Sequence, residues 1–401
     1  MFSSAKSSDS GAAAANPIAF HAVTLATFFG ASAAPTPLYR IYQESFAASP
    51  VMMTGIFAVY AFALLIALLI AGSISDHLGR KPVIFGALLL EIVAMILFVV
   101  ADGPSWLIAA RVVQGLATGI AGASIGASLV DVDRAQGQLV NSLAPLIGMA
   151  VGALGTSALI QYGPFPLHLV YGLLLIGFAL QAVAIWLTPE TGGKRIGALS
   201  SLKPTIAIPP QIKRPLALVT PINIANWALG GFYLSLMPSL VASVTGSRAP
   251  LTGGAVVAAL MAAGAFSVFL RRAYSPRANV TFGVSATTAG MLVVVAGTHL
   301  ANVPVMTLGT LLTGAGFGTS FLGIMGSIMP LAKAEERAGL LSAFYIQSYL
   351  AFSLPAMAAG FLAKTLGYQA TTDIYAAVII VTAVGGLIAS RERRAAVSAV
   401  S

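Results

Sequence analysis

Uninterrupted apolar stretches of roughly 20 residues recur along the chain, and they limit the possible folds more than any other feature. A stretch of that length crosses the hydrocarbon core of a bilayer as a helix, and none shows the alternating pattern of barrel strands. Only 8% of the 401 residues are charged and 58% are hydrophobic, whereas a soluble domain carries about 25% charged residues. We therefore predict an all-α membrane protein and exclude a water-soluble fold.

Polar and Pro/Gly-marked breaks divide the apolar sequence into twelve predicted spans, six in each half. The longest break, 189–213, contains four prolines and predicts a linker between two six-helix bundles. Equal halves are typical of transporters built from repeats. The predicted parts are a lead (1–17), a first bundle (18–188), the linker (189–213), a second bundle (214–390) and a tail (391–401). The predicted spans are 18–38, 51–71, 83–101, 106–129, 139–160, 168–188, 215–240, 251–270, 279–299, 304–328, 339–363 and 374–389.

Lysine and arginine are distributed unevenly between the two sides of these spans. An even number of spans puts both termini on one side, and that side holds 17 of the 21 Lys and Arg residues. The opposite loops hold Arg40, Arg248 and Lys364, and Arg111 lies within a span. Because basic loops stay in the cytoplasm, we predict that both termini and the linker are cytoplasmic.

Composition and spacing also argue against several other functions. The chain has no cysteine, which excludes disulfides and thiolate metal sites. The net charge of +9 is spread over short loops, so nucleic-acid binding is not indicated. His21, His168 and His299 are isolated, and no nucleophile–base pair or phosphate-binding loop is present. We expect no enzyme activity, no cofactor and no metal; the expected partners are a small solute, the lipid bilayer and protons, and the expected oligomeric state is a monomer.

One loop carries a family signature. Between the second and third spans the chain reads Gly72-Ser-Ile-Ser-Asp76-His-Leu-Gly79-Arg80-Lys81, and it resembles the G-x-x-x-D-x-x-G-R-K/R signature of the major facilitator superfamily at every position. Two further matches are Arg111-Val-Val-Gln114-Gly115 in the fourth span and Pro189-Glu190-Thr191 after the sixth. The resemblance implies the twelve-helix fold of bacterial-type secondary transporters in a cell membrane, with a bacterial inner membrane expected.

The resemblance also implies a conformational latch. In the family these loop residues hold the two bundles together on the cytoplasmic side. Here Gly72 would let the second span approach a neighbour, Asp76 could accept hydrogen bonds at a helix N-terminus and pair with Arg80, and Gly79 would permit the turn. The corresponding loop of the second half, Leu270 to Arg277, has no acid, so a second latch is degenerate.

The fifth span departs from an efflux pattern. It reads Ala144-Pro145 with Gly148, Gly152 and Gly155, without the glycine that precedes proline in some bacterial efflux members. Drug/proton antiport is therefore not established by this motif. The glycine spacing instead favours close helix packing.

Two charges fall near the middle of spans, and intramembrane charges are functional candidates. Arg111, Gln114 and Thr118 share one helix face that should line a central cavity, where Arg111 could meet a solute anion or a carboxylate. The alternative is a structural arginine bonded to backbone carbonyls. Glu91 is a candidate proton-coupling site because burial disfavours its charged form. A protonated Glu91 bonded to a neighbouring helix is an equal alternative.

Polar and aromatic residues on other helical stripes suit an uncharged or weakly charged aromatic or amphipathic solute. Helix-to-helix packing is the alternative for each of them. Asn223 and Asn226 are the best candidates, because two carboxamides one turn apart in a span need partners. The set is Thr24, Thr27, Phe28, Tyr60, Asn223, Asn226, Trp227, Tyr345, Ser348, Tyr349 and Phe352.

The predicted function is a secondary active transporter that works by alternating access, with export favoured on family frequency. Uptake of a metabolite or vitamin, such as a riboflavin-like compound, is the alternative. A transport-dead membrane sensor is a remote third, and a partner-binding soluble domain would distinguish it.

The Pro35-Thr36-Pro37 sequence is interpreted as either a hinge or the end of the first span.

Overall fold

The computed structural model describes residues 16–193, 195–247 and 249–398, with side chains described as far as residue 390. Helices dominate these ranges. The longer ones are α1 (Pro17–Ala33), α2 (Pro35–Ser45), α3 (Pro50–Ala71), α5 (Arg80–Val99), α6 (Pro104–Val132), α7 (Arg134–Tyr162), α8 (Leu169–Ala184), α9 (Pro210–Thr245), α10 (Pro250–Arg271), α11 (Pro276–His299), α12 (Val303–Ile328) and α13 (Arg337–Ser398). The short ones are α4 (Ser75–Leu78), η1 (Ile185–Leu187), η2 (Ser200–Leu202), η3 (Met329–Leu331) and η4 (Ala334–Glu336).

Eleven helices in the described ranges are long and apolar enough to cross a membrane. The last of them, Ala334–Ser390, has 57 residues, and a straight helix of that length would measure about 85 Å against a hydrocarbon core of about 30 Å. Gly367 divides it, because its φ of 82° is not helical. The two parts provide two crossings, so the twelve predicted spans and the all-α membrane fold are confirmed.

Most helices begin at a proline or a side-chain cap, as expected where helix N-termini leave N–H groups without partners. Ser49 accepts from Met52 N and Asn302 accepts from Val305 N. Several helices extend beyond the predicted spans: α9 begins inside the predicted linker, and α13 continues past residue 390. The predicted lead lies outside the described residues except Asn16 and Pro17.

The prediction that Pro35 to Pro37 could end the first span is wrong. The helical segment runs from Pro17 to Ser45, with Pro35 at the first position of α2. Proline is tolerated there because the N–H that it lacks has no partner in a first turn. The extension carries Tyr39 and Tyr42 into the buried interior.

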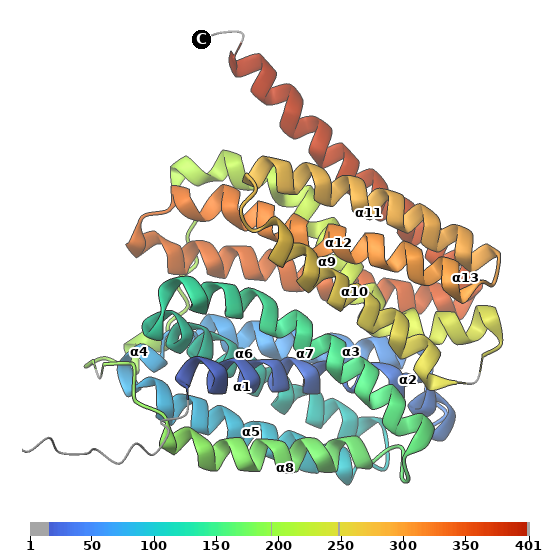
Figure 1. Cartoon of the computed structure of the whole chain (residues 1–401), viewed down its shortest axis with the longest axis horizontal. Helices are drawn as coiled ribbons and strands as arrows, with labels where there is room; N and C mark the ends of the chain where they lie inside the picture. The colour runs from blue at the N-terminus through green and yellow to red at the C-terminus, as the bar shows by residue number, and fades with distance from the viewer. Residues whose placement is uncertain (1–15, 194, 248, 399–401) are drawn as a thin grey trace, which may run out of the picture.

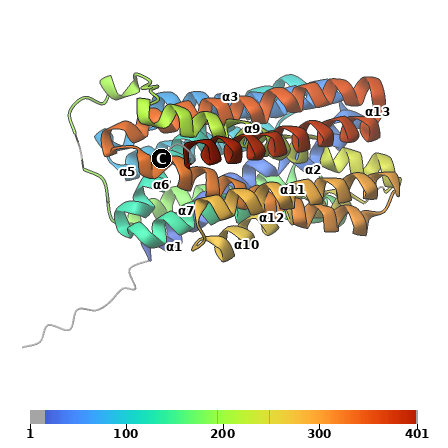
Figure 2. The ribbon, with the colours of Figure 1, turned by 90° about the horizontal axis from the view of Figure 1, so that it is seen from above.

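The helices form two bundles, shown one above the other in Figure 1, with the blue-to-green half below and the yellow-to-red half above. In the first half α1 packs on α6 and α7, α3 packs on α6, and α5 packs on α6 and α8. In the second half α9 packs on α13, and α12 packs on α10 and α11. The bundles meet mainly through two helix pairs, α3 with α13 and α7 with α10, and α2 also packs on α9. Figure 2 shows α3 alongside α13 from above.

Several close contacts join the bundles in the half of the molecule remote from the linker. Thr36 Oγ1 donates to the backbone oxygen of Leu234 at 2.8 Å in a buried position. The rings of Phe57 on α3 and Phe352 on α13 lie 4.9 Å apart. Nearer the linker, Ala207 N donates to Gly339 O at 3.3 Å, which ties the linker to the start of α13.

Candidate functional site

Arg111 and Gln114 form the centre of a buried polar cluster in the first bundle. Arg111 is 1% exposed and Gln114 is 0% exposed. One guanidinium nitrogen of Arg111 donates to Gln114 Oε1 at 2.7 Å and to the backbone oxygen of Ser32 at 3.0 Å. The guanidinium also lies over the ring of Tyr60, 4.3 Å from its centroid. The predicted proximity of Arg111 and Gln114 is confirmed, and this helix face is packed against α1 and α3.

Glu91 belongs to the same cluster through Gln114. Gln114 Nε2 donates to Glu91 Oε1 at 3.1 Å and to Ala31 O at 3.1 Å. Glu91 is 0% exposed, and its Oε2 has no hydrogen-bond partner among the described residues. Gln114 therefore bridges the only two charged side chains that the sequence placed at mid-span. A bridging carboxamide gives Glu91 a donor in either protonation state and leaves Oε2 able to hold a proton.

Three buried tyrosines adjoin the arginine cluster and were not predicted. Tyr42 donates its hydroxyl to Tyr171 at 3.0 Å, and the rings of Tyr171 and Phe98 are stacked at 4.4 Å. The hydroxyl of Tyr39 is buried without a partner among the described residues. The three-residue spacing of Tyr39 and Tyr42 was a usable signal, because it places both on one helix face. Both tyrosines lie beyond residue 38, where the first span was predicted to end.

The second bundle holds a separate polar and aromatic cluster on α9 and α13. Asn223 Nδ2 donates to Ser348 Oγ at 2.9 Å. Three polar atoms of this cluster are buried without partners in the described part of the chain: Asn223 Oδ1, Asn226 Oδ1 and Trp227 Nε1. Since buried polar groups are almost always hydrogen-bonded, these atoms are candidates for bonding to a ligand.

Aromatic rings surround these atoms. The Trp227 ring lies 5.0 Å from Tyr349 and 5.8 Å from Phe352. Tyr345 lies 6.1 Å from Tyr349, on the preceding turn of α13. These separations are typical of edge-to-face and tilted ring pairs. The structure thus brings together the candidates predicted on the seventh and eleventh spans.

The remaining predicted residues divide between the two clusters and other contacts. Tyr60 lies beneath Arg111, and Thr118 donates its hydroxyl to Gln114 O within its own helix. Thr27 lies against α8 instead, where it accepts from Gln181 Nε2 at 2.9 Å. Thr24 bonds to Phe20 O, and Phe28 packs on Phe178 at 5.1 Å. Thr24, Thr27 and Phe28 are therefore in packing positions. The periodicity of the sequence predicts which residues share a helix face, but it does not predict which helix packs against that face.

The predicted latch residues form an ion-pair network. Arg80 pairs with Asp76 and with Asp131, the latter at 3.0 Å, and it donates to Ser75 Oγ at 2.8 Å. The predicted Asp76–Arg80 pair is confirmed. Each partner found in the described ranges belongs to the first half, so the network does not join the bundles in this arrangement.

The glycines of the signature differ in role. Gly79 has φ of 96°, a conformation that favours glycine, and it makes the turn into α5 as predicted. The prediction for Gly72 is wrong: a Cβ there would meet Leu68 of its own helix rather than a neighbouring helix. Its place at the C-terminal end of α3 explains the difference.

Glu190, from the Pro-Glu-Thr sequence, takes the capping role that was predicted for Asp76. Its carboxylate accepts from Arg80 N at 2.8 Å, from Lys81 N at 3.1 Å and from Gly192 N at 2.9 Å. Lys81 Nζ donates to Thr188 O at 2.7 Å and to Trp186 O at 3.2 Å. The end of the sixth crossing is thereby bound to the start of the third.

Replacing Glu190 by Gln should lower the stability of the protein modestly, in a pH-dependent way. Burial raises the pKa of the carboxyl, but N–H donors from Gly192, Arg80 and Lys81 outweigh that effect and hold its pKa below the ordinary value. The stabilisation is therefore present at neutral pH and is lost as the pH falls through the lowered pKa. We expect a loss of about 1 kcal/mol or less at pH 7 in thermal melting. Glu44→Gln is the control, and a Glu190→Gln deficit that persisted in acid would contradict this role.

The second-half loop is held without acids. Arg271 Nε donates to Asn279 Oδ1 at 3.1 Å, and Asn279 Nδ2 donates to Arg271 O at 3.2 Å. The guanidinium of Arg271 also lies over the rings of Tyr274 and Phe282, at 4.4 and 4.1 Å. These neutral partners replace the ion pairs of the first half.

Two of the three α7 glycines predicted to pack closely, Gly148 and Gly152, do so, whereas a Cβ at Gly155 would meet no atom within 4 Å. A Cβ at Gly148 would collide with the backbone of Ala26, and one at Gly152 would collide with the backbone of Gly30. Both contacts lie on α1, so the spacing permits close packing of α1 and α7.

Comparison with known sequences matches a family model and a set of curated proteins. The family model for the Major Facilitator Superfamily matches residues 20–298. The multidrug resistance protein MdtL of Escherichia coli (strain K12) is 29% identical over 140 residues, which cover 34% of this chain and 35% of MdtL. The match thus spans about a third of this relative's length.

Comparison with solved structures shows the fold. The nucleoside transporter NupG has a TM-score of 0.68 at 11% identity, over 93% of this chain and 98% of NupG. The xylose transporter XylE from E. coli has a TM-score of 0.69 at 14% identity, over 92% of this chain and 97% of XylE. The human organic anion transporter MFSD10 has a TM-score of 0.66 at 18% identity, over 92% and 98% respectively.

Proposed function

This chain belongs to the major facilitator superfamily, and from that premise we propose that it transports small, uncharged or weakly charged aromatic solutes by alternating access. Members of this superfamily move small solutes across a membrane, and the helical, multi-pass fold agrees with that role. The proposed location is a bacterial inner membrane. In this mechanism one bundle rocks against the other around a site near mid-membrane.

The observation that carries the proposal is a set of polar atoms on α9 that lie among aromatic rings and have no partner in the described ranges. Asn223 and Asn226 supply two carbonyl acceptors, and Trp227 supplies an N–H donor. Rings of Trp227, Tyr345 and Tyr349 offer faces and edges for a flat solute. A solute with both a donor and an acceptor on an aromatic ring would satisfy these atoms.

We assign proton coupling to Glu91 in this proposal. Its cluster adjoins the solute site through α3, because Phe57 contacts Phe352 and Tyr60 lies one turn further along. Proton binding at Glu91 would leave the Arg111 charge without its counter-charge, and so alter the packing of α3. This gives proton binding a physical route to the interface between the bundles.

Export is the direction that we favour, because the short match to MdtL is to a multidrug resistance protein. Uptake of a flat metabolite or vitamin is the alternative, since the same rings would accept it. Solute concentration on each side of reconstituted vesicles distinguishes the two.

We propose that both termini and the linker are cytoplasmic, from the uneven distribution of Lys and Arg. In that orientation the contacts Thr36–Leu234 and Phe57–Phe352 close the outer side. Epitope tags at the termini and near Lys203 should be reached by antibody only after the cells are permeabilised. Labelling of a tag at Lys203 in intact cells would overturn the orientation.

Asp76→Asn should lower transport while leaving membrane insertion intact. The Asp76 side chain is 42% exposed, so the loss of its ion pair with Arg80 should cost at most about 1 kcal/mol of stability. We propose that transport falls further than stability, because the network must form and break as the bundles move. Transport is compared at equal membrane abundance, with Asp102→Asn as a control at the opposite end of the first bundle. Wild-type transport by Asp76→Asn would contradict the latch.

A proteoliposome uptake screen over aromatic solutes, with and without a pH gradient, tests the proposed function. For a solute that is transported, Asn226→Leu and Trp227→Leu should each raise KM about tenfold, the cost of one hydrogen bond with a buried group. Trp106→Leu is the matched control, because Trp106 is 39% exposed on the outside of the first bundle. An unchanged KM in both site variants would place the solute elsewhere.

A further inference from the structure

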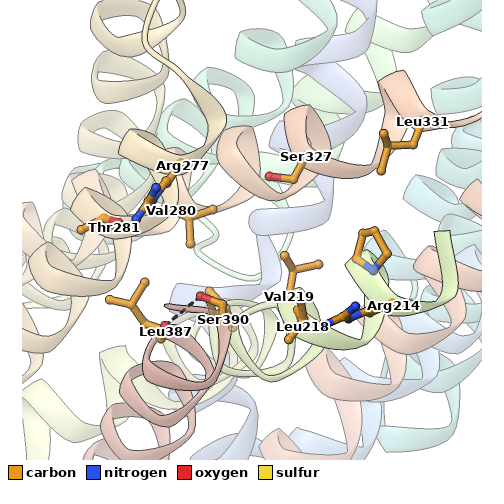
Figure 3. Close-up of a pocket in the computed structure, with 12 residues that line it drawn as sticks. Arg214, Leu218, Val219, Arg277, Val280, Thr281, Ser327, Leu331, Leu387 and Ser390 are labelled. Atoms are coloured by element: carbon orange, nitrogen blue, oxygen red, sulfur yellow. Dashed lines mark hydrogen bonds between the residues drawn. The ribbon is translucent and has the colours of Figure 1, made fainter. Parts of the chain in front are cut away.

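A pocket of about 220 Å³ lies in the second bundle at the end that carries the linker. It is lined by the N-terminal parts of α9 and α11, by the end of α12 with η3, and by Leu387 and Ser390 of α13. Figure 3 shows Arg214 and Arg277 on opposite sides of it, with Val280, Leu387 and Ser390 between them. The pocket is distinct from the α9–α13 cluster proposed for the solute, which lies further along α9.

The lining combines an apolar surface with positive charge. Arg214 and Arg277 are both exposed, and neither makes a hydrogen bond or ion pair with any residue described here. The described residues that line the pocket include no acid. Ser327 and Ser390 donate their hydroxyl protons to Gly323 O and Leu387 O, so the two guanidinium groups and the Thr281 hydroxyl are the side-chain donors available to a ligand.

In the first bundle the equivalent position, between the third and sixth crossings, is filled by side chains of that bundle. There the start of the third crossing meets the end of the sixth, and Lys81 donates to Trp186 O and Thr188 O. The carboxylate of Glu190 completes this arrangement. In the second bundle the start of α11 and the end of α13 occupy the same places in the repeat, and the pocket lies between them.

We propose that this pocket binds an anionic phospholipid of the surrounding leaflet. Its phosphate would lie between Arg214 and Arg277, and part of an acyl chain would cover the surface formed by Val280, Leu218 and Leu387. The charge selects an anionic headgroup, and the apolar surface selects a lipid over a free phosphate. A basic pocket between helix ends at a membrane surface is well suited to such a headgroup.

The test measures lipid binding by the full-length protein in neutral detergent, with phosphatidylglycerol as the probe. Phosphatidylcholine and inorganic phosphate are the comparison ligands. Arg214→Gln and Arg277→Gln should each weaken phosphatidylglycerol binding about fivefold, and the double variant about 30-fold. Lys213→Gln makes the same charge change at the neighbouring exposed position, which does not line the pocket, and should leave binding within about twofold of wild type.

A second variant tests the apolar surface of the pocket separately from the two arginines. Leu387→Trp should fill the apolar part and weaken phosphatidylglycerol while both arginines remain. The proposal is overturned if the double arginine variant binds phosphatidylglycerol like wild type, or if Lys213→Gln loses as much as Arg214→Gln. It is also overturned if inorganic phosphate competes as well as phosphatidylglycerol, which would indicate a simple anion site. Melting temperature without added lipid confirms that each variant is folded.

Discussion

Arg111→Met should destabilise the protein by about 3–5 kcal/mol and abolish transport. The substitution leaves Glu91 buried without a cation, and Gln114 Oε1 and Ser32 O without their donor. It also removes the cation over the Tyr60 ring. Thermal unfolding in detergent and uptake by proteoliposomes are the two measurements.

A double variant gives this prediction its control. Arg111→Met combined with Glu91→Leu removes both charges, and apolar replacement of a buried pair is often neutral for stability. We expect the double variant to recover most of the melting temperature but none of the pH-driven transport. Equal melting temperatures for the single and double variants would show that Arg111 and Glu91 are not coupled. Full transport by Arg111→Met would exclude Arg111 from the mechanism.

Glu91→Gln should lose at least about tenfold in gradient-driven accumulation and keep exchange of solute down its own gradient. Glutamine retains the acceptor for Gln114 Nε2 and the shape of the side chain, but it cannot titrate. Each tenfold loss in the accumulation ratio corresponds to about 1.4 kcal/mol of driving force. The expected loss therefore represents most of the proton contribution to that driving force. Intact pH-driven accumulation by Glu91→Gln would contradict the coupling role.

Glu91→Leu distinguishes coupling from packing. It removes the hydrogen bond from Gln114 together with the proton site. If only Glu91→Leu fails, Glu91 serves to pack α5 against α6 and the carrier is not driven through it. If both variants lose accumulation alone, the carboxyl carries the proton.

The membrane fold could be predicted from the sequence because hydrophobic length and loop charge are local properties. Each apolar stretch between Pro17 and Ser390 corresponds to a crossing, and the complete loop signature identified the family. Helix ends were less predictable, because the bilayer does not limit a helix that extends into the surrounding water. The extension of α13 past residue 390 and the helical turns around Pro35 are examples.

The contacts of the candidate site could be predicted only in part. Periodicity placed Arg111 and Gln114 on one face and joined Asn223 with Asn226. Periodicity does not predict which helix packs against a given face. The hydrogen bonds from Gln114 to Glu91 and from Gln181 to Thr27 could not be predicted, because they depend on packing between distant segments. Glu190 shows the same limit: its motif was evident, but its place at the start of α5 is a long-range contact.

Solute-driven proton movement tests the central claim most directly. Proteoliposomes that contain a trapped pH indicator are given a gradient of an aromatic solute identified in the uptake screen, with no initial pH gradient. The wild-type protein should move protons as the solute moves, Glu91→Gln should move the solute without protons, and protein-free vesicles should do neither. Solute movement by the wild-type protein without any pH change, or equal pH changes with wild type and Glu91→Gln, would contradict proton-coupled transport through Glu91.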